Sequence, residues 1–306
     1  MNEKNENIIF TVLTTYMRLD DVIKWTAISF IGFIFGTTTF TFQEMILPFC
    51  VFLIATFFNM SFCFAINNYY DADSDRKNPR RMNKNALALG KISKKQGMVL
   101  NILFICITFL IIGAYNPGLL YYVVILFVMP AAYSVPPVRL KGRPGIDVIW
   151  HFLGFFIFVL WGSLIAGSLP TITWIIAISL GIFSCIGQLW NHYVDYEFDK
   201  ESGTNTYAVR AGLGTTKKTL NVVLGIHVVI LILLLALYSS HYLITLLIFI
   251  AGLILGFLLF RPKKAGFPTR KSIEFYLTVP AGGSVYISCL FYHLLSTIGV
   301  NLIKIY

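Results

Sequence analysis

The sequence predicts an all-α membrane protein of nine transmembrane helices, built as two parallel four-helix repeats plus a ninth helix. Three observations predict this class: the composition, nine long apolar runs, and an acidic motif that occurs twice. Of the 306 residues, 57% are hydrophobic and only 12% are charged. A soluble globular protein carries about 25% charged residues, so this balance excludes an ordinary soluble globule and favours a polytopic membrane protein.

Nine apolar runs are long enough to cross a bilayer, which requires about 20 residues each. They are residues 22–41, 46–67, 97–115, 118–136, 147–167, 172–192, 219–238, 242–260 and 276–299. A mildly amphipathic segment, residues 8–17, precedes them. It is either a short interfacial helix or a frayed terminus.

Lysine and arginine predict the orientation of these runs. Eight lie between the second and third runs, three between the fourth and fifth, four between the sixth and seventh, and five between the eighth and ninth. Three more precede or begin the first run, and the opposite side has Lys304 alone. The positive-inside rule therefore places the amino terminus and the basic loops in the cytoplasm of a multi-pass cell-membrane protein, with the carboxyl terminus outside. The formal charge of +10 is concentrated in these loops, so we expect no nucleic-acid partner.

An Asn-x-x-x-Asp-x-x-x-Asp motif ends the second run and recurs 124 residues later at the end of the sixth. We call the two copies the first ladder (Asn67, Asp71, Asp75) and the second ladder (Asn191, Asp195, Asp199). Residues at i, i+4 and i+8 share one face of a helix. Tyr69, Gly90 and Lys94 also match residues at the same offset. Residues 22–140 and 147–262 are therefore predicted repeats within one domain of residues 1–306, with 276–299 outside them.

Four helices per repeat leave both copies in the same orientation, so the repeat is parallel. The two ladders then face each other across a central cavity at the cytoplasmic side. Carboxylate and amide oxygens suit hard divalent cations that hold a polyphosphate. Asp73 and Glu197 lie about 200° round the helix from their neighbours in the ladders, so we expect them to be solvated or paired with basic residues. The alternative for all these carboxylates is simple pairing with Arg and Lys at the membrane surface.

Basic residues follow each ladder and fill the loop between the fourth and fifth runs. Arginine forks and lysine point charges both bind phosphate. The candidate diphosphate-binding residues, with the polar residues beside them, are Arg80, Arg81, Tyr133, Arg139, Lys141, Asn191, Lys200 and Arg210. The alternative is that these cations only orient the protein or contact anionic lipid.

These motifs resemble those of the UbiA superfamily of intramembrane prenyltransferases. Asn67-x-x-x-Asp71-x-x-x-Asp75 resembles its first signature, and Asp195-x-x-x-Asp199 with Val209-Arg210-Ala-Gly212 resembles its second. Tyr133-Ser134, Pro136-Pro137 and Arg139-x-Lys141 resemble its loop between spans four and five, and Leu89-Gly90-Lys91-Ile92-Ser93 resembles the stretch before span three.

The resemblance implies a bundle of nine helices around a central cavity, capped by cytoplasmic loops. It implies that Asn67, Asp71, Asp75, Asp195 and Asp199 hold Mg²⁺, two ions per site, on the diphosphate of geranylgeranyl or a similar isoprenoid. These residues and Lys141 are the candidate catalytic groups, and the basic loops draw off the leaving diphosphate.

The implied acceptor is lipophilic: a quinone precursor ring, a porphyrin-type ring or a glycerol-based archaeal lipid precursor. Two segments depart from the family pattern, because Met82-Asn83 follows Arg81 and Arg18 is followed by Leu-Asp-Asp. These departures leave the acceptor class open. Two other functions fit the acidic ladders: a transporter that couples them to ions, and a structural protein that binds divalent ions or lipid.

Overall fold

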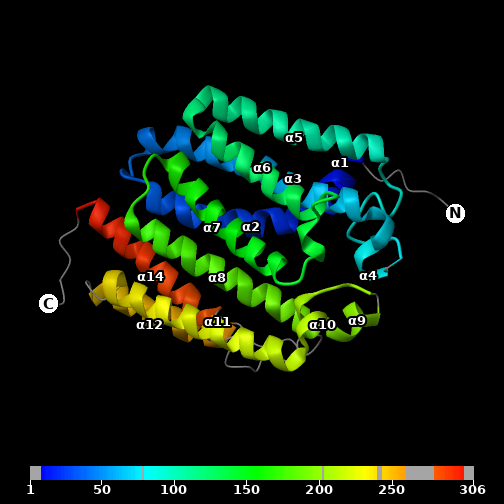
Figure 1. The fold of residues 1–306 in the computed structure, drawn as a ribbon. Helices are drawn as coiled ribbons and strands as arrows, with labels where there is room; N and C mark the ends of the chain where they lie inside the picture. The colour runs from blue at the N-terminus through cyan, green and yellow to red at the C-terminus, as the bar shows by residue number, and fades with distance from the viewer. Residues whose placement is uncertain (1–7, 78, 202, 240–242, 260–278, 300–306) are drawn as a thin grey trace.

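The computed structural model describes residues 8–77, 79–201, 203–239, 243–259 and 279–299. Within these ranges every regular element is a helix (Figure 1). The longer helices are α2 (Leu19–Gly36), α3 (Phe42–Asp75), α5 (Lys94–Tyr115), α6 (Leu120–Ser134), α7 (Ile146–Ala166), α8 (Thr171–Val194), α11 (Leu213–Leu234), α12 (Leu243–Leu259) and α14 (Pro280–Thr297). The short ones are α1 (Ile8–Thr11), η1 (Val12–Tyr16), α4 (Pro79–Met82), η2 (Pro117–Leu119), η3 (Leu140–Gly142), α9 (Tyr196–Glu201), α10 (Tyr207–Ala211) and η4 (Leu235–Ser239).

Each predicted apolar run overlaps one of the longer helices in the described part of the chain. Six helical segments there are long and apolar enough to cross a membrane: Phe42–Asp75, Lys94–Tyr115, Pro117–Ser134, Ile146–Ala166, Thr171–Val194 and Leu213–Tyr238. The protein is therefore an integral membrane protein. Helix α2 carries three charged residues in its first two turns, and α12 is shorter at 17 residues, so the count of nine spans stays a prediction. The basic loop predicted between the last two runs lies outside the described residues.

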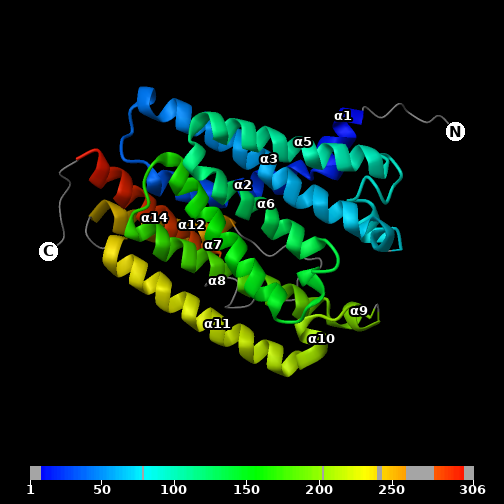
Figure 2. The same cartoon turned by 45° about the horizontal axis from the view of Figure 1, so that its top comes forward.

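Helix α7 lies in the middle of the bundle and packs against both α2 and α8 (Figures 1 and 2). Its contact with α2 is very close, because small residues face each other there. A Cβ atom at Gly162 would lie 1.9 Å from the carbonyl oxygen of Ser29, and one at Gly32 would lie 1.9 Å from that of Val159. The Ser29 hydroxyl donates a 2.7 Å hydrogen bond to the Phe158 carbonyl. Small residues of this kind let helices in a membrane approach until their backbones touch.

Helices α3 and α6 also pack against α7, α5 packs against α3 and α6, and the three share a buried aromatic core. The Trp161 indole donates a 3.1 Å hydrogen bond to the Thr56 hydroxyl, which satisfies both groups where α7 meets α3. The short helices α4, α9 and α10 lie at one end of the bundle (Figure 1). That end also holds the carboxyl end of α3, so the fold brings the segments around both ladders to one end.

Residues 8–16 are helical, so the frayed-terminus alternative is wrong for this segment. Its first residues are exposed, but Tyr16 is fully buried. The Tyr16 hydroxyl donates to the Gly97 carbonyl at 2.9 Å and accepts from Asn101 at 3.0 Å. The Asn68 amide donates to the Tyr16 carbonyl at 2.9 Å. The segment is thus fixed to α3 and α5 by buried polar contacts as well as by any interfacial preference.

The close contact between α2 and α7 predicts that two glycines of α7 differ in how far an added methyl group destabilises the protein. We expect Gly162→Ala to destabilise the protein by about 1–3 kcal/mol, because the added methyl group would overlap the α2 backbone. Gly154→Ala is the matched control, since nothing lies within 4 Å of a Cβ at that position. Thermal denaturation of the two variants in the same detergent measures the difference; equal midpoints would contradict the packing.

Candidate functional site

The first ladder stands on one continuous helix. Helix α3 runs to Asp75, eight residues past the predicted end of its apolar run at 67. The second ladder corrects the prediction of a single helix face. Helix α8 ends at Val194, Asp195 caps it, and α9 begins at Tyr196. The spacing survives the break, because the Asp195 and Asp199 amides still donate to carbonyls four residues earlier, at 2.9 and 2.8 Å.

The first ladder is bound by two cations from the loop between α6 and α7. The Lys141 ammonium forms an ion pair with the Asp71 carboxylate and donates to the Asn67 amide oxygen at 3.2 Å. The Arg139 guanidinium reaches the same Asp71 oxygen at 3.3 Å. Ser134, at the end of α6, donates to Asn67 at 3.3 Å. The side chains of Asp71 and Lys141 are 13% and 17% exposed, so this is a partly buried ion pair.

The loop holds its cations in place by its own geometry. Leu140 is buried between them and anchors η3. Arg139 adopts a left-handed backbone conformation with φ of 33°, which costs a non-glycine residue about 1–3 kcal/mol and is concentrated at functional sites. Burial lowers the pKa of the Lys141 ammonium, while the charge of Asp71 opposes that shift. The ammonium is thus poorly hydrated and available to an anion.

Asp75, the last residue of the first ladder, is buried against an asparagine that the sequence patterns did not single out. The Asn85 amide donates to the Asp75 carboxylate at 2.9 Å and to the Asn68 carbonyl at 2.8 Å. Its oxygen accepts from the Leu87 and Ala88 amides at 3.1 and 3.3 Å. Asn85 is fully buried and ties the segment after the first ladder back onto α3.

The second ladder has one buried carboxylate and two exposed residues. Asp199 is 4% exposed, whereas Asn191 and Asp195 are solvent-exposed. Burial raises the pKa of the Asp199 carboxyl above its ordinary value, and the negative charge of Asp195 raises it further. A cation at this position would therefore be stabilised by both carboxylates.

Arg81 interacts electrostatically with a carboxylate of each ladder. Its charge acts on Asp75 and also on Asp199. Its guanidinium lies over the Phe198 ring at 5.8 Å from the centroid. The two acidic motifs, 124 residues apart in the sequence, therefore share one electrostatic neighbourhood.

The other predicted diphosphate-binding residues are placed as follows. Tyr133 lies at the end of α6, near the charges of Asp71 and Asp147. Lys200 lies over the Tyr196 ring at 5.8 Å, and Arg210 is exposed on α10. Arg80 belongs to α4, and its side chain lies outside the described residues.

A second polar cluster lies beside the site and was not predicted. The His192 Nε2 atom is 3.0 Å from the Asp147 carboxylate, and the Gln188 amide contacts both residues, at 3.0 Å and 3.3 Å. Asp147 and His192 are almost fully buried. This cluster joins the start of α7 to the end of α8, next to Asp199, whose carboxylate interacts electrostatically with His192.

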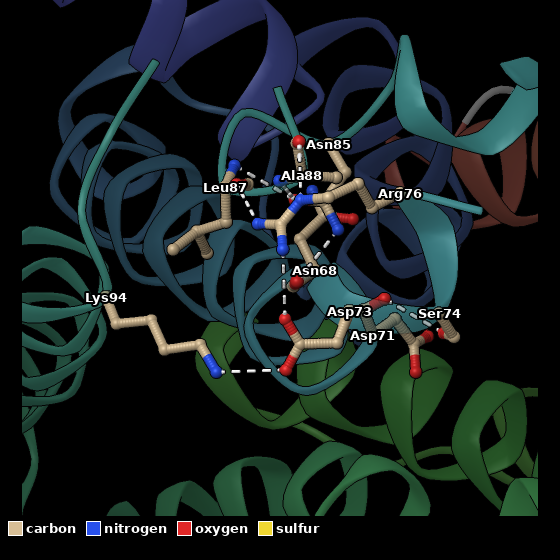
Figure 3. Close-up of polar contacts among 9 residues, drawn as sticks. All are labelled: Asn68, Asp71, Asp73, Ser74, Arg76, Asn85, Leu87, Ala88 and Lys94. Carbon is tan, nitrogen blue, oxygen red and sulfur yellow. Dashed lines mark hydrogen bonds and ion pairs between the residues drawn. The ribbon is translucent and has the colours of Figure 1, made fainter. Parts of the chain in front are cut away.

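The carboxylates off the ladders behave as expected. Asp73 pairs with Lys94 at 3.1 Å and with Arg76 at 3.4 Å, and all three side chains are more than half exposed. Figure 3 shows Asp73 directed at these two cations while Asp71 points away from them. Glu197 is exposed. The prediction of surface pairing is thus confirmed for Asp73, whereas Asp71 pairs in a partly buried position with cations of the same candidate site.

The donor chemistry of the two ladders fits magnesium, because it consists of carboxylate and amide oxygens. No three acidic, histidine or cysteine side chains in the described ranges lie close enough together to form a metal site. Positive charge beside the carboxylates comes instead from three side chains, Lys141, Arg139 and Arg81. The same carboxylates attract these side chains and would attract a metal ion, so the donor chemistry suits Mg²⁺ while cations lie beside the carboxylates.

Comparison with solved structures gives the same fold. A UbiA homolog from Archaeoglobus fulgidus, solved bound to GPP and Mg²⁺, superposes with a TM-score of 0.66 at 24% identity, covering 94% of this chain and 100% of that one. A structure from work on a digeranylgeranylglyceryl phosphate synthase in membranes gives 0.68 at 17% identity, covering 96% and 99%.

Among curated proteins, a lycopene elongase/hydratase of Corynebacterium glutamicum is 29% identical over 154 residues. The match spans only about half of each protein, 49% of this chain and 53% of the relative. A profile of the UbiA prenyltransferase family matches residues 25–278, which is most of the sequence. The chain belongs to the UbiA prenyltransferase family.

Proposed function

We propose that this protein transfers a prenyl group from an allylic isoprenyl diphosphate to a lipophilic acceptor and releases diphosphate. The proposal rests on one observation: three cations lie among the two acidic ladders at one end of an apolar helical bundle. These cations are Arg81, Arg139 and Lys141. The A. fulgidus homolog, solved with GPP and Mg²⁺, supports the same substrate class and ion.

The acidic and the basic residues of the site have different proposed roles. Asn67, Asp71, Asp75, Asp195 and Asp199 would hold Mg²⁺, which when bound supplies charge that stabilises the leaving diphosphate. Lys141 and Arg139 bind the phosphate oxygens, exchanging Asp71 for the substrate as their partner. The bond between the prenyl carbon and the diphosphate oxygen breaks with its electron pair on oxygen, and the acceptor bonds to the allylic carbon and loses a proton. The apolar bundle excludes water, which would otherwise capture the allylic cation.

We further propose nine spans with both ladders at the cytoplasmic side, two parallel repeats in a single domain, and capping loops over a central cavity. The donor is geranylgeranyl diphosphate or a similar long isoprenoid. The acceptor is an aromatic quinone precursor or a glycerol-based lipid precursor. No residue of the described site distinguishes these acceptors.

Product analysis tests the proposed reaction directly. The purified protein in lipid, with Mg²⁺ and geranylgeranyl diphosphate, is offered a quinone precursor ring, a porphyrin-type ring and a glycerol phosphate lipid precursor in parallel. We expect mass spectrometry to find one acceptor increased by the prenyl mass, with diphosphate released in equal amount. Flux of a solute across proteoliposomes without any covalent product would instead support the transporter alternative.

The ladder carboxylates can be tested against their neighbours off the ladders. We expect Asp71→Asn and Asp195→Asn each to lower the rate of Mg²⁺-dependent transfer about 100-fold, because each removes charge that holds the ion. Asp73→Asn and Glu197→Gln remove one carboxylate from the same segments and should keep nearly the wild-type rate. Folded ladder variants that work as fast as the wild type would refute the assignment.

The effect of Lys141 can be measured separately from the effect of the overall positive charge of its loop. We expect Lys141→Gln to lower kcat/KM for the diphosphate donor about 100-fold, since it removes a partly buried cation from beside the first ladder. Arg143→Gln, at an exposed position of the same loop, is the control and should stay near wild type. Thermal midpoints of both variants are measured alongside. A stable Lys141→Gln protein with unchanged kcat/KM would exclude this role.

A further inference from the structure

A cavity of about 470 Å³ lies beside the end of α3. It is lined by Ala72, Arg76, Leu87, Gly90, Lys91, Ile92, Ser93, Lys94 and Gln96. These residues come from the end of α3, the segment that follows it and the first turn of α5. The volume falls in the range of about 300–1,000 Å³ that is usual for small-molecule sites.

This cavity is separate from the candidate catalytic site. Asp71 and Asp75 face Lys141 and Asn85, whereas Ala72 and Arg76 lie next to them in sequence and line the cavity. Residues adjacent on a helix point about 100° apart.

The cavity carries an excess of positive charge. Three of its lining side chains are cations, Arg76, Lys91 and Lys94. Asp73 pairs with both Arg76 and Lys94, so these two cations alone exceed their shared carboxylate by one charge. These pairs are exposed, so they are worth little and an incoming anion can exchange with Asp73 at small cost.

The floor of the cavity is apolar. Ala72, Leu87 and Ile92 are at most 5% exposed. A cationic rim above an apolar floor, at the end of two membrane-crossing helices, matches a phosphate group that is attached to hydrocarbon. A freely soluble phosphate would contact only the cationic rim and would leave the apolar floor without a hydrocarbon group against it.

The segment that forms the cavity is fixed. Arg76 donates to the Ala88 and Leu87 carbonyls at 3.3 and 3.4 Å, and Asn85 holds the same stretch from within. Ser93 and Gln96 form a reciprocal capping box at the start of α5, which uses two of the amides there. The side-chain cations, rather than the end of the helix, are therefore what attracts an anion.

We propose that this cavity binds the phosphate headgroup of an anionic glycerophospholipid of the surrounding leaflet. The site rests on the placement of this end of α3 at the membrane surface and does not require prenyl transfer. Asn85 contacts both the cavity segment and Asp75, so a bound headgroup would also steady the position of one carboxylate of the first ladder.

Native mass spectrometry of the full-length protein tests the site with phosphatidylglycerol and phosphatidylcholine as probes. We expect phosphatidylglycerol to be retained more tightly by the wild type. The double variant Lys91→Gln/Lys94→Gln should weaken its binding about tenfold or more, since each lysine near an anionic headgroup contributes measurably. Lys84→Gln/Lys95→Gln is the matched control, because it removes the same charge from exposed positions nearby that do not line the cavity.

Three results would overturn the proposal. Equal retention of the two lipids would mean that no headgroup is recognised. Equal losses in the two double variants would mean that only net charge matters. Displacement of phosphatidylglycerol by glycerol 3-phosphate or inorganic phosphate at equal concentration would assign the cavity to a soluble phosphate. Lys94→Gln alone breaks only an exposed ion pair and repeats the comparison if the double variant does not fold. None of these results bears on prenyl transfer, which is measured separately.

Discussion

The partly buried ion pair between Asp71 and Lys141 is the contact on which the rest of the candidate site depends. A charge at the end of an apolar helix is costly to bury unless a partner compensates it. Here the partner comes from a loop 70 residues further along the chain. Because Lys141 reaches Asp71, side chains from the end of α6 and the loop that follows it meet the end of α3, and Arg139, Ser134 and Asn67 are gathered in the same place. The pair also leaves the ammonium poorly hydrated, which prepares it for an anionic substrate.

Helix α3 shows how one segment can carry two environments. Asp71 and Asp75 are buried or nearly so, while Asp73, two residues from each, is 70% exposed on its side chain. The chemistry of the three side chains is the same, and only their direction around the helix differs. Asp71 contacts Lys141 and Asp75 contacts Asn85, and both carboxylates belong to the candidate catalytic site. Asp73 pairs with Arg76 and Lys94, two cations that line the cavity beside the end of α3.

Several parts of the fold and site could be predicted because their signals are local. Apolar runs of about 20 residues predict membrane helices wherever they occur. The second apolar run ends at 67 because hydropathy falls at the polar ladder, but the spacing of that ladder predicts a continuing helix, and α3 does continue to Asp75. The break at Asp195 was missed, since the i, i+4 spacing looks helical and nothing in it marks the turn. Asp147 and His192 gave no signal, because they lie 45 residues apart in two different apolar runs.

The sequence by itself determined that this is a helical membrane protein and that two acidic ladders with basic neighbours are its candidate chemistry. Those conclusions follow from hydropathy and from the periodicity of a helix, which are properties of short segments. Only the tertiary structure decided which cation meets which carboxylate: Lys141 and Arg139 with Asp71, Arg81 near both Asp75 and Asp199, and Lys94 with Asp73. These pairings join segments distant in the chain, and they depend on how closely packed helices place each loop at the end of the bundle. The ladders could therefore be read from the sequence, but their partners could not.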